Sequence, residues 1–379
     1  MSRIYLSAPH MGSLEEQYVR EAFATNWVST VGPNLEAFER DFSERLLGGL
    51  PCVALSSGTA AIHLALKLLG VERDDEVFCA TLTFAGSANP IVYQGARPVF
   101  LDSERTSWNL DPDVLEEAIS ARARAGKLPR AVIVVHLYGQ SADLDRLEAV
   151  CARYDVPILE DAAEAVGTHY RGAQVGTRAP VSAFSFNGNK IITTSGGGLL
   201  VARERSWVEK ARFWSQQARE PKPWYEHEEI GFNYRMSNVL AGIGRGQLAV
   251  LEERVAARRA IAFRYKEAFA DLPGIELAPQ APHGRRTNWL SVFLIDEAVL
   301  GVTRDEIIAA LAKEDIESRP VWKPMHLQPV FRSCDYFGSG VAEDIFRRGI
   351  CLPSSSNLST ADQDRVIDVV RRVSLAARA

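Results

Sequence analysis

Cysteine is scarce in this sequence, and its spacing carries no metal or redox motif. The chain has five cysteines among 379 residues, an odd number, and none belongs to a CxxC pair. This pattern argues against a disulfide framework and a zinc site, and it favours a reducing compartment. No apolar run approaches the roughly 20 residues of a membrane span, and the first residues lack the apolar segment of a secretory signal. We therefore expect a cytoplasmic protein with no membrane partner.

Three further absences narrow the functional classes that fit this sequence. The net charge of −5 gives no electrostatic reason to expect a nucleic-acid partner. The seven histidines show no HExxH or comparable spacing, so we predict no metal site. Internal repeats and low-complexity tracts are also missing. What remains is an ordinary globular composition, long enough for two domains.

Short apolar runs alternate with amphipathic stretches in the first half of the chain. The expected strands are 52–55, 76–80, 97–102, 131–135 and 157–161. The expected helices between them are 60–69, 85–93, 111–124 and 142–154. This alternation of strands and helices predicts a doubly wound α/β sheet, in which a ligand binds beyond the carboxyl ends of the strands.

The chain changes character beyond residue 274. A small α+β domain is predicted from strands at 289–295 and 317–321 and from helices at 303–313 and 361–377. A long helix over 238–270 would join it to the first domain. We place the boundary near residue 255, which gives a large domain of 1–255 and a small domain of 256–379.

One lysine stands at the end of a predicted buried strand. The stretch from Val181 to Gly198 passes through Asn187-Gly188, presents Lys190 and ends in three glycines. Burial would depress the pKa of this lysine, and a neutral lysine amine can form a Schiff base with a carbonyl. Asn-Gly between apolar runs is equally a hairpin signal with a solvated lysine in the turn. Both interpretations stay open at this point.

Two other candidate sites lie at predicted strand ends. The small residues Ser56 to Thr59 precede a helix, whose first amides and dipole favour a phosphate. Ser57 or Thr59 could instead simply cap that helix. Asp161 ends an apolar strand, where it would either cap a following helix or be held against a cation in a cleft.

Three local patterns carry further predictions. Ser13 and Glu16 form the sequence of a capping box. Gly242 to Gly246 superficially resembles a dinucleotide loop, but no strand precedes it, so we predict close helix packing, with a subunit interface as one setting. His136 ends a predicted strand and could face a pocket or be a satisfied interior histidine.

Four motifs in this order resemble one enzyme family. They are Ser57–Ala60, Glu160–Ala163, Ser185–Lys190 and Gly231–Asn238. Together they are similar to the DegT/DnrJ/EryC1/StrS sugar aminotransferases, which are fold-type I enzymes that use pyridoxal 5′-phosphate (PLP). The resemblance covers essentially the whole chain and implies a large domain with a mixed, mostly parallel sheet and a smaller C-terminal α+β domain.

The resemblance implies roles at the matching positions. Lys190 would be the Schiff-base lysine and would then carry protons. Asp161 would pair with the pyridinium nitrogen and keep the ring an electron sink. Glu164 would lie near the phenolic oxygen of the cofactor, and Phe84 would cover the ring face. The remaining cofactor contacts, at the phosphate, would be Gly58, Thr59, Ala60 and Ser185.

The resemblance also implies a homodimer with active sites at the subunit interface. Asn233 would reach the phosphate bound by the other subunit. The sugar nucleotide would contact Arg235, Arg319, Trp322, Lys323 and His326. Cations suit phosphates, and an aromatic ring suits a base. Core packing of Trp322 and a solvated Lys323 are the alternatives for these two residues.

The implied reaction transfers the amino group of L-glutamate to a UDP-linked 4-keto sugar. Residues 186–198 and 160–165 most resemble the enzymes that aminate C4 of UDP-4-keto-6-deoxy-N-acetylglucosamine on the bacillosamine route. A GDP-perosamine synthase, or another 4-keto-sugar aminotransferase, is an alternative. The sugar 3-dehydratases of the family carry histidine in place of the lysine, and Lys190 argues against them. A non-catalytic PLP-binding regulatory protein is the alternative from a different class.

Overall fold

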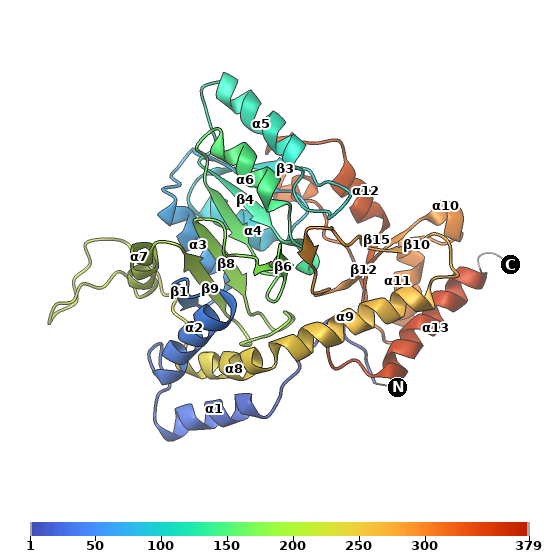
Figure 1. The fold of residues 1–379 in the computed structure, drawn as a ribbon, viewed down its shortest axis with the longest axis horizontal. Helices are drawn as coiled ribbons and strands as arrows, with labels where there is room; N and C mark the ends of the chain where they lie inside the picture. The colour runs from blue at the N-terminus through green and yellow to red at the C-terminus, as the bar shows by residue number, and fades with distance from the viewer. Residues whose placement is uncertain (1, 377–379) are drawn as a thin grey trace.

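A large mixed sheet lies at the centre of the molecule (Figure 1). The computed structural model describes residues 2–376. Within them, eight strands form this sheet in the order β1 (Cys52–Leu55), β9 (Gly198–Ala202), β8 (Val181–Ser185), β5 (Ile158–Asp161), β4 (Ala131–Val135), β2 (Glu76–Ala80), β3 (Arg97–Leu101) and β14 (Tyr336–Phe337). In the described part of the chain, β9 alone runs antiparallel to its neighbours. The predicted α/β fold with a mostly parallel sheet is confirmed.

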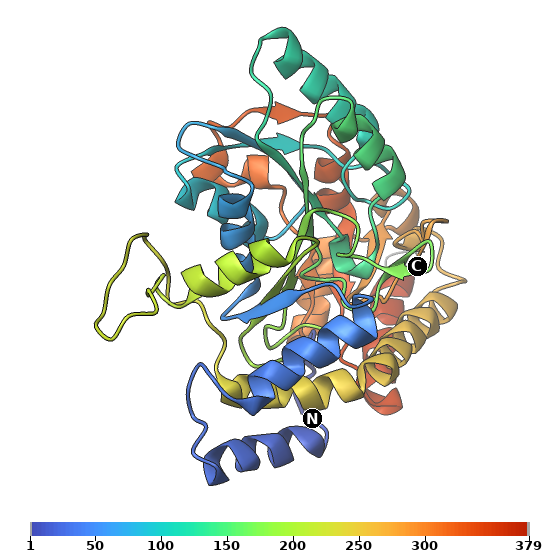
Figure 2. The same ribbon diagram turned by 60° about the vertical axis from the view of Figure 1, so that its left-hand side comes forward.

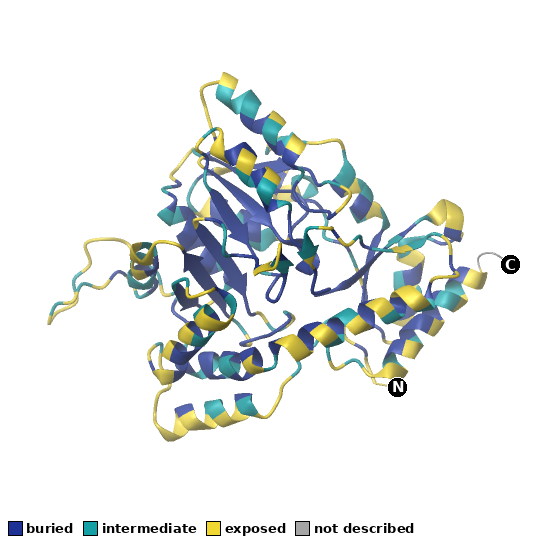
Figure 3. Cartoon of the chain, viewed as in Figure 1, coloured by how far each residue is buried: buried dark blue, intermediate teal, exposed yellow. Residues whose placement is uncertain are grey.

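The strands form where the sequence has short apolar runs, because both faces of the sheet are covered. Every residue of β1, β2, β4, β5, β8 and β9 is buried, and the sheet is continuously dark in Figure 3. The predicted strands at 52–55, 76–80 and 131–135 match the observed bounds residue for residue.

Helices pack on both faces of this sheet (Figure 2). One face carries α5 (Pro112–Arg124) and α6 (Leu144–Ala152), and the other carries α3 (Gly58–Leu68), α4 (Ala85–Tyr93) and α7 (Arg205–Ser215). At the end next to β1 lie α1 (Leu14–Ala24), α2 (Pro33–Leu46) and α8 (Asn238–Ala249). The segment between α7 and α8 extends away from the body in Figures 1 and 2.

A second, smaller sheet follows in the C-terminal part. Its strands are ordered β10 (Ile275–Leu277), β12 (Ser291–Ile295), β15 (Gly349–Leu352) and β13 (Arg319–Pro320). The helices of this part are α10 (Glu297–Leu300), α11 (Arg304–Lys313), α12 (Val341–Arg348) and α13 (Thr360–Ala376). A short sheet of β11 (Gly284–Arg285), β6 (His169–Tyr170) and β7 (Ala173–Gln174) links the two parts.

The helix α9 (Leu251–Ala268) runs from the large sheet to the small one. It contributes Val255 to the core of the large sheet and Ile261 to the core of the small sheet. Ile4 also packs in the smaller core and pairs with Ile316, although it lies at the other end of the sequence. The boundary near residue 255 therefore falls inside a helix shared by both cores, and it stays a prediction.

Three local predictions differ from the structure. The helix expected over 238–270 is two helices, separated at Val250 (φ −110°, ψ 13°), so that α8 packs on α1 and α2 while α9 turns toward the small sheet. The strand expected at 317–321 is limited to β13. No capping box forms at Ser13, because its side chain makes no cap hydrogen bond. The helix expected at 361–377 is α13, and residue 377 lies outside the described residues.

Close helix packing at Gly242 to Gly246 is confirmed within the chain. A Cβ on Gly246 would lie 2.7 Å from the Glu15 nitrogen of α1, and one on Gly244 would lie 2.8 Å from the Phe38 ring of α2. Side chains here would force α8 away from both helices. None of the helices described up to residue 376 is long and apolar enough to cross a membrane.

Candidate active site

A cavity of about 310 Å³ lies beyond the carboxyl ends of the central strands. Pockets of roughly 300 Å³ and more are typical of small-molecule sites. Eight of the residues predicted as site residues line it: Gly58, Thr59, Phe84, Asp161, Glu164, Ser185, Lys190 and Trp322. Three elements of the large sheet and one loop of the small domain thus converge on one space.

Sheet order explains why Asp161 and Lys190 meet. β5 and β8 are parallel neighbours, with Asp161 opposite Ala183 in the register. Their carboxyl ends therefore lie at the same edge of the sheet. Asp161 is the last residue of β5, and Lys190 follows the end of β8 by five residues, so both side chains can face the cavity.

Lys190 lies in a hairpin connection and is also buried, so each of the two interpretations left open by the sequence is correct in part. β8 and β9 do pair as an antiparallel hairpin, but the connection carries Lys190 into the cavity instead of into solvent. Its side chain is 12% exposed, and its Nζ lies 4.1 Å from the centre of the Trp289 ring. Burial lowers the pKa of the Lys190 amine. A larger fraction of the nucleophilic neutral amine follows.

Asp161 is a buried carboxylate held by two donors. The Ser87 hydroxyl donates to Oδ2 at 2.6 Å, and the Ala163 amide donates to Oδ1 at 3.1 Å. Ser87 in turn is 2.7 Å from the Thr83 hydroxyl. No helix begins at Ala162 in the described structure, so the alternative of a helix cap is wrong. The carboxylate is oriented toward the cavity by α4 and the loop before it.

Glu164 lies beside the lysine. Its Oε1 is 4.0 Å from the Lys190 Nζ and accepts a hydrogen bond from the Trp322 indole at 3.1 Å. Its Oε2 accepts one from the Tyr138 amide at 2.8 Å. Burial raises the pKa of this carboxyl, which favours the protonated form.

The opposite end of the cavity is suited to an anion. The Ser57 side chain does cap α3 by accepting from the Ala60 amide at 3.0 Å, so the capping prediction is confirmed for Ser57. The first amides of a helix nonetheless have no partner within it, and the helix dipole favours negative charge. A Cβ on Gly58 would lie 2.9 Å from the Ser185 Cβ, so glycine lets the Ser185 hydroxyl reach this end.

Four aromatic side chains pack together on the side of the cavity that faces the small domain. We call Phe84, Tyr138, Trp289 and Trp322 the aromatic wall. The Tyr138 ring stacks on Trp289 and Trp322 with centroids 6.1 and 5.8 Å away, and Phe84 lies 5.6 Å from Trp322. The Tyr138 hydroxyl accepts the backbone amide of Trp322 at 2.9 Å. The wall therefore joins the two sheets at the cavity.

Sequence reasoning missed Tyr138, Trp289 and Ser87. Tyr138 has left-handed backbone angles (φ 51°, ψ 27°), which aim its amide at Glu164. Such angles are uncommon for a residue other than glycine and concentrate at functional sites. Their positions were the available signal, because Tyr138 follows a predicted strand and Trp289 is the first residue of another.

Six predicted residues lie outside the cavity lining in this chain. Ala60 is buried in the first turn of α3, and Asn233 is exposed. Arg235 is buried, where it pairs with Glu39 and donates to the Ala54 carbonyl at 2.8 Å. Arg319 is exposed and pairs with Glu317. These ion pairs satisfy both guanidinium groups.

His326 and Lys323 are also outside the cavity lining. The His326 ring stacks on Tyr336 at 3.8 Å and hydrogen-bonds Thr81 at 2.7 Å. These contacts join the loop of His326 to the large domain, and the substrate contacts expected at Arg235, Arg319, Lys323 and His326 stay predictions. Lys323 follows Trp322 directly and is half-buried.

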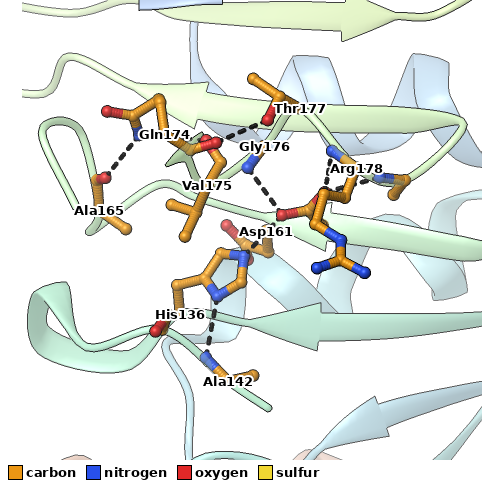
Figure 4. Close-up of polar contacts among 12 residues, drawn as sticks. His136, Ala142, Asp161, Ala165, Gln174, Val175, Gly176, Thr177 and Arg178 are labelled. Carbon is orange, nitrogen blue, oxygen red and sulfur yellow. Dashed lines mark hydrogen bonds and ion pairs between the residues drawn. The ribbon is translucent and has the colours of Figure 1, made fainter. Parts of the chain in front are cut away.

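His136 is a satisfied interior histidine (Figure 4). It is fully buried, and its Nδ1 accepts the Ala142 amide at 3.2 Å. Its Nε2 therefore carries the proton and donates to Glu160 at 2.9 Å. The Gly176 amide donates to the same carboxylate at 2.7 Å. Within residues 2–376, no cluster of His, Cys, Asp and Glu side chains could hold a metal ion.

The residues present fit the PLP that the motifs imply. A buried amine with a lowered pKa suits an aldehyde, and a buried carboxylate suits a ring nitrogen. The α3 terminus with Ser185 suits a phosphate. Phe84, which is 57% exposed at the cavity, offers an aromatic face to a planar ring.

Comparison with known proteins leads to the same chemistry. The family model described as the DegT/DnrJ/EryC1/StrS aminotransferase family matches residues 9–371. EpsN of Bacillus subtilis (strain 168), a candidate PLP-dependent aminotransferase, is 50% identical over 97% of this chain and 95% of its own. The GDP-perosamine synthase of Caulobacter vibrioides is 38% identical over 98% of this chain and 99% of its own.

A solved structure agrees as well. The aminotransferase TlmJ from Streptoalloteichus hindustanus is 31% identical, with a TM-score of 0.88 over 99% of both chains. Enzymes of the matched family depend on PLP, so the predicted cofactor is confirmed. This chain belongs to the DegT/DnrJ/EryC1/StrS family of PLP-dependent sugar aminotransferases.

Proposed function

We propose that the enzyme aminates C4 of a nucleotide-linked 4-keto-6-deoxy sugar, namely UDP-2-acetamido-2,6-dideoxy-4-hexulose, with L-glutamate as the donor. The observation that carries this proposal is that one cavity is lined by Lys190, Asp161 and three residues of the aromatic wall, namely Phe84, Trp289 and Trp322. The products are the UDP-linked 4-amino sugar and 2-oxoglutarate.

The residues of the cavity have distinct tasks in this reaction. When bound, PLP supplies an electrophilic carbon for the amine and a ring that withdraws electrons from a carbanion. Asp161, oriented by Ser87, holds a proton at the ring nitrogen. Lys190 takes a proton from the carbon of the donor and returns one to the sugar carbon as a general base and acid. Glu164 stabilises the protonated lysine between these transfers, because it lies 4.0 Å away.

The aromatic wall is the proposed sugar-binding side. Trp322 presents a half-buried indole to the cavity and is fixed by hydrogen bonds to Tyr138 and Glu164. Lys323, the next residue, would meet the diphosphate as a flexible cation. The fixed indole keeps water from the cavity and limits the orientations that a bound sugar can take.

We also propose a homodimer in which Asn233 acts on the phosphate end of the other subunit's cavity. Asn233 is exposed and pairs with Gln216 at the end of α7, after the segment that projects from the body in Figures 1 and 2. Exposed Phe23, Trp27 and Val28 near α1 offer apolar surface for a partner. All five cysteines are free, which suits the cytoplasmic location that we propose.

A mixing experiment tests the shared site. Lys190→Ala and Asn233→Ala homodimers should each be nearly inactive. After subunit exchange, half of the dimers would be mixed and each would hold one intact site, so activity should rise to about a quarter of wild type. Activity that stays at the level of the separate variants would contradict a shared site.

A substrate panel tests the proposed reaction. The enzyme with PLP and L-glutamate is given UDP-, GDP- and dTDP-linked 4-keto-6-deoxy sugars, and 2-oxoglutarate and amino sugar are measured. We expect the UDP-linked acetamido sugar to have the highest kcat/KM, by at least about tenfold, which corresponds to 1.4 kcal/mol. Equal or lower turnover of that sugar would overturn the substrate assignment.

The GDP-linked 4-keto sugar is the second candidate. The 38% identity to a GDP-perosamine synthase over nearly the whole chain favours it. In the panel, a higher kcat/KM for the GDP-linked sugar would establish it as the substrate. Glutamate-dependent formation of 2-oxoglutarate without any sugar product would leave the donor half of the proposal intact and reject all sugars tested.

A further inference from the structure

Arg258 is a buried cation directly behind the active-site lysine. It lies on α9 and is 1% exposed. Among residues 2–376 no carboxylate lies within ion-pair distance of its guanidinium, and its Nε has no hydrogen-bond partner. Burial lowers the pKa of this group to about 9, with a further contribution from Arg254. A buried cation without a counter-charge costs several kcal/mol, so packing alone does not account for it.

The guanidinium of Arg258 is surrounded by backbone carbonyls from both domains. Its Nη1 donates to the Trp289 carbonyl at 2.7 Å and to the Ser354 carbonyl at 3.0 Å. Its Nη2 donates to the Ser7 hydroxyl at 3.1 Å and to the Lys190 carbonyl at 3.4 Å. The planar fork of arginine can satisfy several acceptors in fixed directions, which an ammonium group cannot do.

The peptide before Lys190 is held in the same way. The Asn189 carbonyl accepts from the Ser7 hydroxyl at 2.6 Å and from the Trp289 indole at 2.8 Å. The carbonyl groups on both sides of the Lys190 Cα are therefore fixed. Ser7 and Trp289 each contact both that peptide and Arg258, which makes one connected network.

We propose that Arg258 is a positioning residue for Lys190, which fixes the backbone that carries the reactive amine and ties it to the small domain. Lys190 must place its Nζ against the aldehyde carbon of PLP, form the carbon–nitrogen bond and release the aldehyde oxygen as water. A misplacement of about 1 Å can slow such a reaction about a hundredfold. The inference rests on the PLP chemistry of the family and does not depend on which sugar is the substrate.

Arg258→Lys tests this role, with Arg264→Lys as the matched control. Arg264 lies on the same helix, but it is only half-buried and pairs with Asp364. PLP is added to PLP-free protein, and the growth of visible absorbance gives the rate of covalent linkage. The Kd of pyridoxamine 5′-phosphate, which does not react with the lysine, is measured on the same samples.

The proposal predicts a specific pattern. In Arg258→Lys the linkage rate should fall by at least about tenfold, while the Kd of pyridoxamine 5′-phosphate changes less than about twofold. Arg264→Lys should match wild type in both. A folded Arg258→Lys protein with an unchanged linkage rate, or an equal loss in both measurements, would overturn it.

A second variant covers the case in which Arg258→Lys does not fold. Ser7→Ala removes the hydroxyl shared by Arg258 and the Asn189 carbonyl while leaving both backbones in place. It should slow linkage by about threefold or more, because the Asn189 carbonyl and the Arg258 guanidinium each lose a hydrogen-bond partner. An unchanged linkage rate in folded Ser7→Ala would then contradict the network. A sugar panel that fails would not affect either result, because no sugar is used.

Discussion

The Glu164 carboxylate lies 4.0 Å from the Lys190 amine, and burial acts on the two groups in opposite directions. It raises the pKa of the carboxyl and lowers the pKa of the amine. Both shifts favour a neutral pair, whereas the attraction between the charged forms opposes them. The protonation of the lysine therefore depends on Glu164.

Removing this charge should change the pH dependence of lysine reactivity. The carboxylate of Glu164 raises the pKa of Lys190, so Glu164→Gln should lower it further. The rate of PLP linkage to PLP-free protein should then reach its plateau at a lower pH than in the wild-type protein. Glu252→Gln, at an exposed site, is the control and should leave the profile unchanged. A shift to higher pH would contradict this account.

Replacing Asp161 by asparagine should keep the shape of the site and remove its charge. We expect PLP to remain bound while the rate of its reaction with L-glutamate falls by about a hundredfold or more, as for other preorganised charges in active sites. Ser87→Ala, which removes only the hydrogen bond at Oδ2, should cost less. Stopped-flow absorbance measures both. An Asp161→Asn rate close to wild type would remove the carboxylate from the chemistry.

Aromatic packing next to the connection that carries Lys190 should contribute strongly to the free energy of unfolding. Phe186 is fully buried and contacts Phe38 and Phe42 edge to face, with centroids 5.3 and 5.6 Å away. Phe186→Ala should lower the free energy of unfolding by about 3–5 kcal/mol. Phe263→Ala, at a 47% exposed position, should change it by less than about 0.5 kcal/mol. Urea titration of both variants decides whether this cluster anchors the turn.

Asp102 should stabilise the fold in a pH-dependent way. Burial opposes its charge, but amides of Ala342, Ser103 and Val341 donate to it, and the net result is a pKa below its ordinary value. Its contribution is then complete above the ordinary aspartate pKa of about 3.9 and is lost as pH falls through the folded value.

Asp102→Asn is the test of that contribution. It should destabilise the protein by about 1.5–3 kcal/mol at pH 7, the range for hydrogen bonds to a charged group. The difference from wild type should be the same at pH 5 and should shrink below pH 4. Urea unfolding at several pH values measures it, and a difference that grows on acidification would refute the sign.

The sequence predicted the parts of the site that depend on local patterns. β5 and β8 were predictable as buried apolar runs, and the rule that ligands bind at their carboxyl ends placed Asp161 and Lys190 together. Gly58 and Ser185 followed from the motif resemblance. In each case the chemistry lies within a few residues of a regular element.

The features that the sequence did not predict depend on contacts between segments that are far apart in the chain. The pairing of Arg235 with Glu39 spans 196 residues of sequence, and nothing local indicates that this arginine is already neutralised. The aromatic wall requires Tyr138 to adopt a left-handed backbone and Trp322 to fold back on it. The break at Val250 likewise reflects packing between distant segments, because α8 contacts α1 and α2 whereas α9 runs to the small sheet.

The central claim is that the Lys190 amine carries the cofactor. Borohydride reduction of the PLP-loaded protein, followed by proteolysis and mass spectrometry, locates the covalent link directly. We expect the mass of reduced PLP on the peptide that contains Lys190, and no such label in Lys190→Ala. Label on another lysine, or on none, would contradict the account.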